Sequence, residues 1–147
     1  MSKLVSQGVF PVHNNKFEVE TADSTYSTIA ELENFSPAFD NTIEEWYSMD
    51  NEGWSSALLT GKKWGLTLSG KRCIGNTGQD FLIDKQFSIG QDAYANFKWT
   101  MPSGTVITQQ MVVSVTNNSG GDTTNVAPFE IELTSNGKPT ISTVTEG

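Results

Sequence analysis

Residues 93–116, AYANFKWTMPSGTVITQQMVVSVT, decide the fold class. Phe97 and Trp99 fall on one face of an extended chain, and polar residues fall on the other. Since successive side chains of a strand point to opposite faces, this alternation predicts a half-buried strand. A Pro-Ser-Gly turn at 102–104 and a second apolar stretch at 105–116 follow, and together these segments predict an antiparallel hairpin.

The same signals recur on both sides of this hairpin. Turn residues at 60–63 separate two expected strands, and Pro37 is expected to end another. One helix is predicted over 77–88, with Thr77 as its N-cap. Alternating or short apolar segments predict further strands at 16–20, 25–35, 55–59, 64–72, 126–134 and 140–144.

The sequence therefore predicts a mainly β protein, an antiparallel β-sandwich or partly open barrel with one flanking α-helix. Its 147 residues favour a single domain over residues 1–147. Three segments are expected outside the regular sheet. They are an N-terminal arm at 1–15, a long inter-strand loop at about 40–63 and a tail at 144–147.

Charge is distributed unevenly along the chain. Residues 1–52 hold ten acidic and two basic residues, whereas residues 53–147 hold seven of each, so the net charge of −8 lies wholly in the first third. An acidic domain is a poor nucleic-acid binder, because binding requires Lys and Arg to displace counterions from phosphates. Solubility alone is an equally good explanation of the excess acid.

The number of cysteines and the hydropathy of the chain indicate the cellular compartment in which the protein folds. A single cysteine, Cys73, excludes an intrachain disulfide and fits folding in a reducing cytoplasm. The first residues carry no apolar run of signal-peptide length, and no later segment approaches the length of a membrane span. We therefore expect cytoplasmic folding and no membrane partner.

Signals for catalysis and cofactors are weak. Residues 65–72, GLTLSGKR, miss the P-loop pattern at the last position, where Arg72 replaces the hydroxyl residue that contacts magnesium. His13 is the only histidine and falls in the expected arm, which leaves a catalytic triad without a base. One His, one Cys and no acidic cluster with loop-site spacing give no metal site. We expect no enzymatic activity and no cofactor.

Residues 44–54, EEWYSMDNEGW, combine four carboxylates with three aromatic side chains. Carboxylate pairs perform glycoside hydrolysis, but they usually come from separate strands that face each other across a cleft. Solvated acids around an interface are therefore the favoured explanation. Trp46, Tyr47 and Trp54, together with Trp64, either stack on sugar rings or anchor an interface, and the residues alone leave both alternatives open.

An ordered series of motifs resembles the major tail tube proteins of long-tailed, siphovirus-type bacteriophages. The series covers residues 29–141, and its specificity lies in the order and spacing of the pieces. They are DNTIEEWYSMD at 40–50, EGW at 52–54, LLTGK at 58–62, LTLSGKR at 66–72, GNTGQDF at 75–81, WTMPSG at 99–104, GGD at 120–122 and NGKP at 136–139.

This resemblance implies a structural virion protein. Six copies would form a ring, stacked rings would form the hollow phage tail tube, and the sheet edges of neighbours would join into an inner barrel. The tube would house the tape-measure protein, meet the tail terminator and distal tail proteins, and conduct DNA without binding it specifically. The tube would be assembled in the host bacterial cytoplasm and would reside in the virion.

The resemblance also implies roles for particular residues, because the excursion at about 40–63 would contact the next ring. The expected contact residues are Glu44, Glu45, Trp46, Tyr47, Asp50, Glu52, Trp54, Lys62, Lys63, Lys71 and Arg72. Six glutamates expected to alternate with apolar residues on strands are candidates for an acidic lumen face, namely Glu18, Glu20, Glu31, Glu33, Glu130 and Glu132. The alternatives are a carbohydrate-binding β-sandwich module and a single-ring tail terminator or head–tail joining protein.

Overall fold

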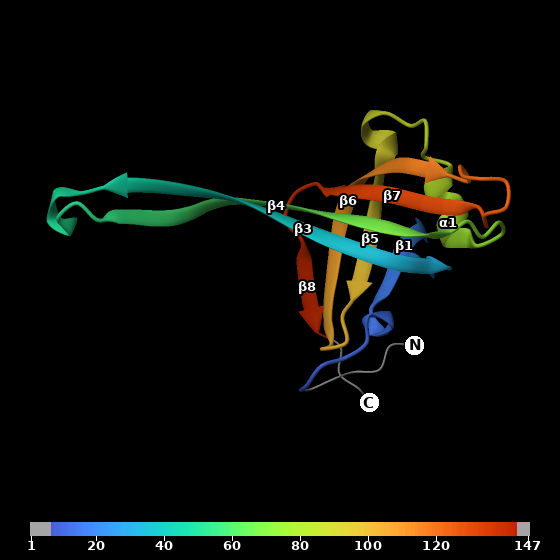
Figure 1. Ribbon diagram of the computed structural model, residues 1–147, viewed down its shortest axis with the longest axis horizontal. Coiled ribbons are helices and arrows are strands. Elements are labelled where there is room, and N and C mark those ends of the chain that lie inside the picture. Colours follow the sequence, from blue (N-terminus) through green and yellow to red (C-terminus); the bar gives the residue numbers. More distant parts are fainter. Residues whose placement is uncertain (1–6, 144–147) are drawn as a thin grey trace.

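The structure is a computed structural model and describes residues 7–143. Its strands form one strongly curved antiparallel sheet in the order β2–β1–β5–β6–β7–β4–β3, and β8 pairs with the first part of β6 (Figure 1). The strands are β1 (Lys16–Ala22), β2 (Thr25–Thr28), β3 (Leu32–Tyr47), β4 (Ser55–Lys71), β5 (Tyr94–Thr100), β6 (Thr105–Asn118), β7 (Pro128–Ser135) and β8 (Thr140–Thr143). The helical segments are α1 (Thr77–Ile83) and three short 3-10 turns, η1 (Val12–Asn14), η2 (Met49–Asn51) and η3 (Gly90–Ala93).

The curvature of the sheet brings its two ends together around the core. Phe35 of β3 lies 4.8 Å from Phe17 of β1 and 5.6 Å from Trp99 of β5, measured between ring centroids. No ladder joins β1 to β3 within residues 7–143, so the sheet stays open. The predicted mainly β fold with one helix is confirmed, and it takes the form of an open, curved sheet.

The interior of this sheet is filled by the residues that the sequence alternation places on one face. The predicted hairpin at 93–116 is β5 and β6, which pair from Tyr94↔Val112 to Thr100↔Val106. The buried core draws on five strands and the helix. Its fully buried apolar side chains include Val19, Leu68, Leu82, Met111, Phe129, Ile131 and Leu133, and its aromatic members include Phe17, Trp64, Phe97 and Trp99.

Helix α1 packs against β1, β2 and β6 at one end of the sheet. The predicted N-cap, Thr77, is wrong, because the side chain of Asn76 caps the helix. Its Oδ1 atom accepts hydrogen bonds from the backbone N–H of Gln79, at 2.9 Å, and of Ala30, at 3.3 Å. The helix ends at Ile83 instead of residue 88, because the backbone N–H groups of Lys85 and Gln86 bond to carbonyls only three residues earlier.

Two predicted strand boundaries are also wrong. The expected strand at 25–35 is interrupted at residues 29–31, where Glu31 adopts a left-handed φ of 60° and Ile29 donates its N–H to the carbonyl of Phe17. Pro37 does not end a strand but lies within β3, opposite Leu66. A proline is tolerated there because β3 is the edge strand of the described sheet, and no strand among residues 7–143 pairs with the other side of its backbone.

Gln79 is a fully buried polar side chain of α1 that links three segments of the fold. Its Oε1 atom accepts hydrogen bonds from Cys73 N–H, at 2.8 Å, and from Arg72 Nη1, at 3.1 Å. Its Nε2 atom donates to the carbonyls of Ala30, at 2.7 Å, and Lys71, at 2.8 Å. The side chain therefore joins the helix to the end of β4 and to the link between β2 and β3.

Replacing Gln79 by leucine is expected to lower the free energy of unfolding by about 2–4 kcal/mol. The volume hardly changes, but buried donors and acceptors lose their partner, and each unpaired buried group costs about 1–3 kcal/mol. Urea denaturation checks this, with Gln91→Leu at an exposed position as the matched control. Equal denaturation midpoints for the two variants would contradict the assigned role of Gln79.

Candidate assembly surfaces

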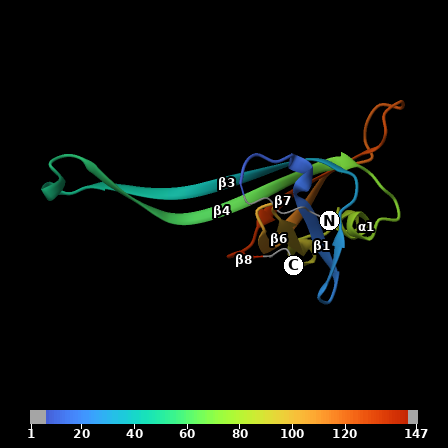
Figure 2. The ribbon, with the colours of Figure 1, turned by 90° about the horizontal axis from the view of Figure 1, so that it is seen from below.

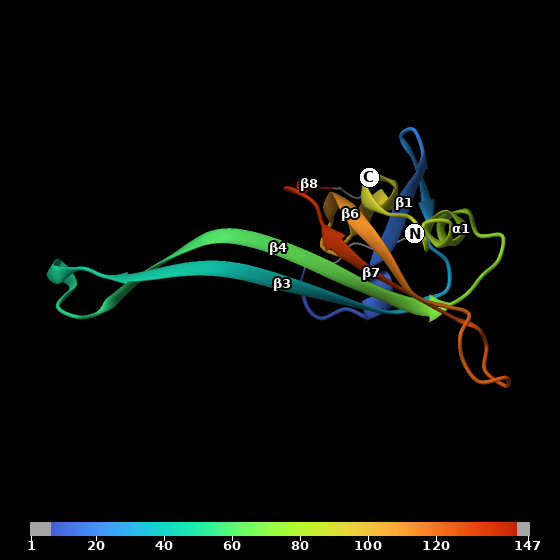
Figure 3. The ribbon, with the colours of Figure 1, turned by 90° about the horizontal axis from the view of Figure 1, so that it is seen from above.

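A long β-hairpin projects from the body of the molecule, and three views agree on this (Figures 1, 2 and 3). Strands β3 and β4 pair from Leu32↔Gly70 to Tyr47↔Ser55. On its other side β4 pairs with β7, but only as far as Gly65↔Thr134. Beyond that point, within residues 7–143, the two strands pair only with each other and form a ribbon, residues 39–64.

The predicted loop at about 40–63 is therefore a two-stranded ribbon. Asp40-Asn41 and Thr60–Lys63 carry turn residues, and each segment on its own favours a break in the chain. The structure pairs them across the ribbon, with Asp40 opposite Lys63 and Asn41 opposite Lys62. Because this pairing is made between segments about 20 residues apart, local turn signals could not reveal it.

The tip of the hairpin, residues 44–54, contains an ordered turn. Backbone N–H groups of Asn51 and Glu52 donate to carbonyls three residues earlier, and Asn51 Nδ2 donates to Ser56 Oγ at 2.6 Å. Glu52 and Gly53 take left-handed φ angles of 53° and 91°. Residues 50–51 thus lie in a turn, and this turn presents a defined shape to solvent.

The ribbon exposes large apolar side chains. Trp46 is 45% exposed, Tyr47 74% and Trp54 77%, and the neighbouring Ile43, Met49, Leu58 and Leu59 are exposed as well. A two-stranded hairpin by itself is marginally stable in water, and contiguous exposed apolar surface marks interaction sites. The ribbon therefore has the character of a segment that another chain covers.

The carboxylates of the tip, on Glu44, Glu45, Asp50 and Glu52, share this exposed surface. None of them takes part in the salt bridges found among residues 7–143. The tip thus combines aromatic surface with uncompensated negative charge, as expected of a contact that meets a basic partner.

A groove of about 800 Å³ lies at the base of the ribbon, beside the start of β8. Phe39, Trp64, Ile107, Pro139 and Ile141 supply its apolar lining, and Lys62, Lys63 and Lys138 also line it. Sequence analysis named Lys62 and Lys63 as contact residues and left open an interface role for Trp64, but it missed the others. No local sequence pattern groups these residues, because they come from four separate segments that only the folded sheet brings together.

The floor of this groove is held in place by hydrogen bonds. The ring of Phe39 stacks on Trp64 with centroids 5.9 Å apart, and Trp64 Nε1 donates to Gln109 Oε1 at 3.0 Å. Gln109 is buried, and its amide donates to the carbonyls of Gln110 and Asn136. Because Trp64 is buried in this arrangement, it does not present a face for a sugar ring to stack on.

Three of the four predicted basic contact residues form ion pairs within their own chain. Lys63 Nζ lies 3.8 Å from Asp40 Oδ2, and both side chains are exposed. Lys71 Nζ lies 3.0 Å from Glu33 Oε1, on the exposed surface. The side chain of Arg72 is only 12% exposed, and its Nη2 atom lies 2.8 Å from Asp80 Oδ1. Arg72 therefore has a structural role beside α1, whatever else it contacts.

Four of the six candidate lumen glutamates lie on the polar face of the sheet. Glu18 alternates with buried Phe17 and Val19 on β1, and Glu130 and Glu132 alternate with buried Phe129, Ile131 and Leu133 on β7. Glu20, also on β1, accepts a hydrogen bond from Asn96 of β5 at 2.8 Å. Glu31 departs from the prediction, because it lies in the link between β2 and β3 and not on a strand.

Tyr26 reports the negative potential on this face. Burial raises the pKa of the Tyr26 phenol above its ordinary value, and the nearby carboxylates of Glu20 and Glu18 raise it further. Lys98 Nζ also lies 4.1 Å from the centroid of its ring. Burial and the nearby carboxylates both disfavour the phenolate, so folding favours the neutral form of Tyr26.

The raised pKa of Tyr26 gives a pH dependence of known sign. Its contribution to stability is complete below the unfolded-state pKa of about 10 and is lost as the pH rises through the higher folded-state pKa. Ultraviolet titration of Tyr26→Phe is expected to lack a phenolate component that titrates above the ordinary tyrosine pKa. If Tyr26→Phe removes a component at the ordinary pKa instead, the acidic face does not act on Tyr26.

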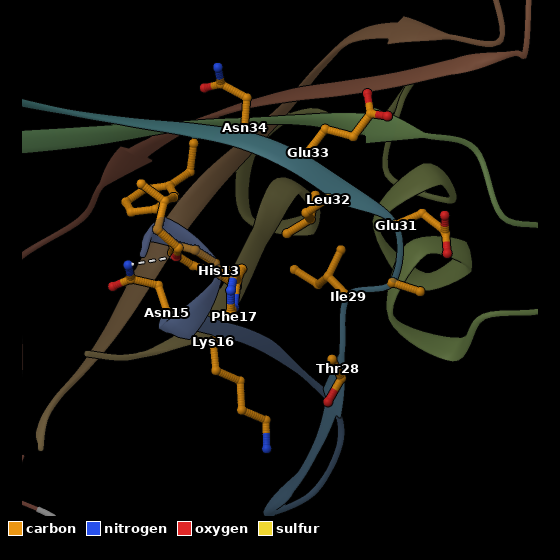
Figure 4. Close-up of a pocket in the computed structure, with 13 residues that line it drawn as sticks. His13, Asn15, Lys16, Phe17, Thr28, Ile29, Glu31, Leu32, Glu33 and Asn34 are labelled. Carbon is orange, nitrogen blue, oxygen red and sulfur yellow. Dashed lines mark hydrogen bonds between the residues drawn. The ribbon is translucent and has the colours of Figure 1, made fainter. Parts of the chain in front are cut away.

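A second concavity, of about 580 Å³, lies between η1 and β1 on one side and residues 28–35 on the other (Figure 4). Figure 4 shows Ile29 and Leu32 pointing toward each other in it, with His13 at its edge.

Among residues 7–143 there is no group of three or more side chains suited to bind a metal. No helix in this part of the chain is long and apolar enough to cross a membrane.

Comparisons with known proteins place the fold. No protein-family model and no curated protein sequence matches the chain. Among solved structures, a chain of the tail of an empty gene transfer agent particle, refined with C6 symmetry, is similar with a TM-score of 0.73 and 13% identity, over 91% of this chain and 99% of that one.

Two further structures are similar at lower scores. A chain of the PVC sheath–tube complex, from an extracellular contractile injection system in its extended state, has a TM-score of 0.61 and 16% identity over 92% of this chain and 93% of that one. A chain of the tube-terminating cap of the anti-feeding prophage has a TM-score of 0.62 and 15% identity over 97% of each chain. The protein therefore has a fold that occurs in chains of phage-like tails, sheath–tube complexes and tube caps.

Proposed function

We propose that the protein is a structural, non-enzymatic subunit of a tail tube, which forms hexameric rings that stack into a hollow conduit. The observation that carries this proposal is the exposed ribbon, whose aromatic and acidic surface is left uncovered by the part of the chain that the structure describes. The fold supports it, since similar chains come from a tail refined with C6 symmetry and from a sheath–tube complex.

The unpaired edges of the sheet favour closure into a ring. β2 and β3 are the outermost strands of the sheet, and β3 offers an edge of 16 residues that no other strand within residues 7–143 covers. Such edges pair with other chains unless they are protected, and a ring of copies pairs them without leaving one free. Edge-to-edge joining would make a continuous inner barrel.

The charge of the chain suits a conduit for DNA. Six copies of a chain with a net charge of −8 carry −48 in every ring. Like-charge repulsion, acting over a screening length of about 8 Å, keeps duplex DNA from adhering to an acidic wall. Glu18, Glu20, Glu130 and Glu132 would provide part of that wall, because they share the polar face of the sheet.

The finer form of the proposal follows the sequence resemblance. The tube would house a tape-measure protein, end at tail terminator and distal tail proteins, assemble in the host cytoplasm and belong to a virion with a non-contractile tail. The likeness to a chain of a contractile system means that the fold alone does not distinguish the two tail types. A single-ring terminating protein is the second candidate, because the chain of the anti-feeding prophage cap has a similar fold.

Negative-stain electron microscopy of the purified protein across a concentration series tests the proposal. Hollow tubes or stacked rings are the expected result. Isolated rings that never stack would favour the terminating protein. Monomers at every concentration, also under crowding conditions, would contradict assembly and would make a glycan-binding screen the next step, because Trp46, Tyr47 and Trp54 are exposed.

A further inference from the structure

Resting on the proposed function, we propose where the hairpin tip binds. The tip (residues 44–54) of one copy docks in the groove at the ribbon base (Phe39, Trp64, Ile107, Pro139 and Ile141 with Lys62, Lys63 and Lys138) of another copy. The contact is head to tail, since each copy offers one tip and one groove.

The apolar surfaces of the two sites match in kind. The tip presents exposed Trp46, Tyr47 and Trp54, and Phe39 and Ile141 in the groove are each 65% exposed. Aromatic side chains that enter an apolar pocket are the commonest anchors of protein interfaces. The groove is also preorganised, because Trp64 at its floor donates a hydrogen bond to the buried Gln109, so little ordering is required on docking.

Charge selects the tip as the occupant. The tip carries four carboxylates and no basic residue, whereas three lysines line the groove. One carboxylate of the same chain, on Asp40, is near them, 3.8 Å from Lys63 Nζ. Other exposed apolar segments match the groove less well. Residues 7–15, with Val9 and Phe10, have no acidic residue, and residues 84–92, with Phe87 and Ile89, have two aspartates and one lysine, for a net charge of −1 against −4 at the tip.

The tip cannot occupy the groove of its own chain. Eight residue steps separate the pair Phe39↔Trp64 from the pair Tyr47↔Ser55, a span of about 26 Å at about 3.3 Å per residue. The paired ribbon holds the two sites apart at this distance. A head-to-tail contact between copies that does not close on itself propagates, so each docking event presents a new groove and a new tip.

Cross-linking tests the contact directly. In a Cys73→Ser background, one preparation carries Met49→Cys at the tip and the other Ile141→Cys in the groove, so that every charge is kept. A short thiol-reactive cross-linker is expected to join the two chains into a mixed dimer. The matched control pairs Met49→Cys with Asp84→Cys, an exposed position beside α1, and is expected to give at least tenfold less product.

Charge reversal tests the specificity of the contact. Glu44→Lys with Glu45→Lys, and separately Lys62→Glu with Lys138→Glu, are each expected to lower the yield of the mixed dimer at least tenfold. A chain with all four changes is expected to recover it, because the complementarity is restored in the opposite sense. Lys16→Glu with Lys85→Glu changes the net charge as much as the groove variant does but lies outside the groove, and it should have little effect.

The outcomes separate this inference from the proposed function. Tubes without the mixed dimer would overturn docking in the groove and leave the tube intact. The mixed dimer without tubes would support docking and contradict polymerisation, and the absence of both would contradict both. Cross-linking of Ile141→Cys to Val9→Cys in place of Met49→Cys would assign the groove to the arm and overturn the inference.

Discussion

Trp54→Ala is expected to yield a folded monomer that no longer forms tubes. Trp54 is 77% exposed and lies at the tip of the ribbon, so the chain loses almost no packing when it is truncated. In the assembled state the same side chain would be a buried anchor, and truncation of such an anchor costs about 2 kcal/mol or more. That is about a 30-fold loss in the affinity of each contact, repeated in every copy of the ring.

Circular dichroism and urea denaturation are expected to show an unchanged fold for Trp54→Ala, and gel filtration is expected to show a monomer. Negative-stain electron microscopy then compares tube formation at matched protein concentrations. Trp54→Phe is the control, because it keeps an aromatic ring at the tip and should still assemble. Tubes of normal length from Trp54→Ala at the wild-type concentration would rule out the assigned role of the tip.

Gly70→Ala is expected to have the largest effect on the stability of the monomer. Gly70 lies near the end of β4, where the link between β2 and β3 crosses over it. A Cβ atom at Gly70 would overlap the carbonyl oxygen of Glu31 and lie 2.8 Å from the Cα atom of Leu32. Both clashes are with backbone, which cannot move aside without breaking the hydrogen bond from Lys71 N–H to the Glu31 carbonyl.

We therefore expect Gly70→Ala to lower the free energy of unfolding by about 3 kcal/mol or more, a large part of the stability of a domain of this size. The control is Gly61→Ala in the same strand, where the nearest atom to an added Cβ is the Cβ of Thr42 at 3.4 Å. Urea denaturation compares the two. If Gly70→Ala were as stable as Gly61→Ala, the segment that joins β2 to β3 would not pass as close to Gly70 as the structure shows.

Sequence analysis succeeded where the evidence is local. The alternation of residues 93–116 predicted the β5–β6 hairpin, and the alternation around Glu130 and Glu132 predicted β7 with its buried and polar faces. The helix was placed correctly at its start but was too long, because the apolar spacing continues past Ile83 while the backbone turns more tightly. The acidic and aromatic composition of residues 44–54 also identified the surface on which the proposal of assembly rests.

By itself, the sequence determined that the protein is mainly β with one helix, that its negative charge lies in the first third, and which side chains face the core, because alternation acts over a few residues and needs no distant partner. Only the tertiary structure decided that residues 39–64 form a ribbon, since turn-forming residues become strand when each segment supplies the other's hydrogen bonds. It alone also decided the groove, which joins Phe39, Trp64, Ile107 and Ile141. Such a site depends on which strands become neighbours in a curved sheet, and that order is set by long-range packing.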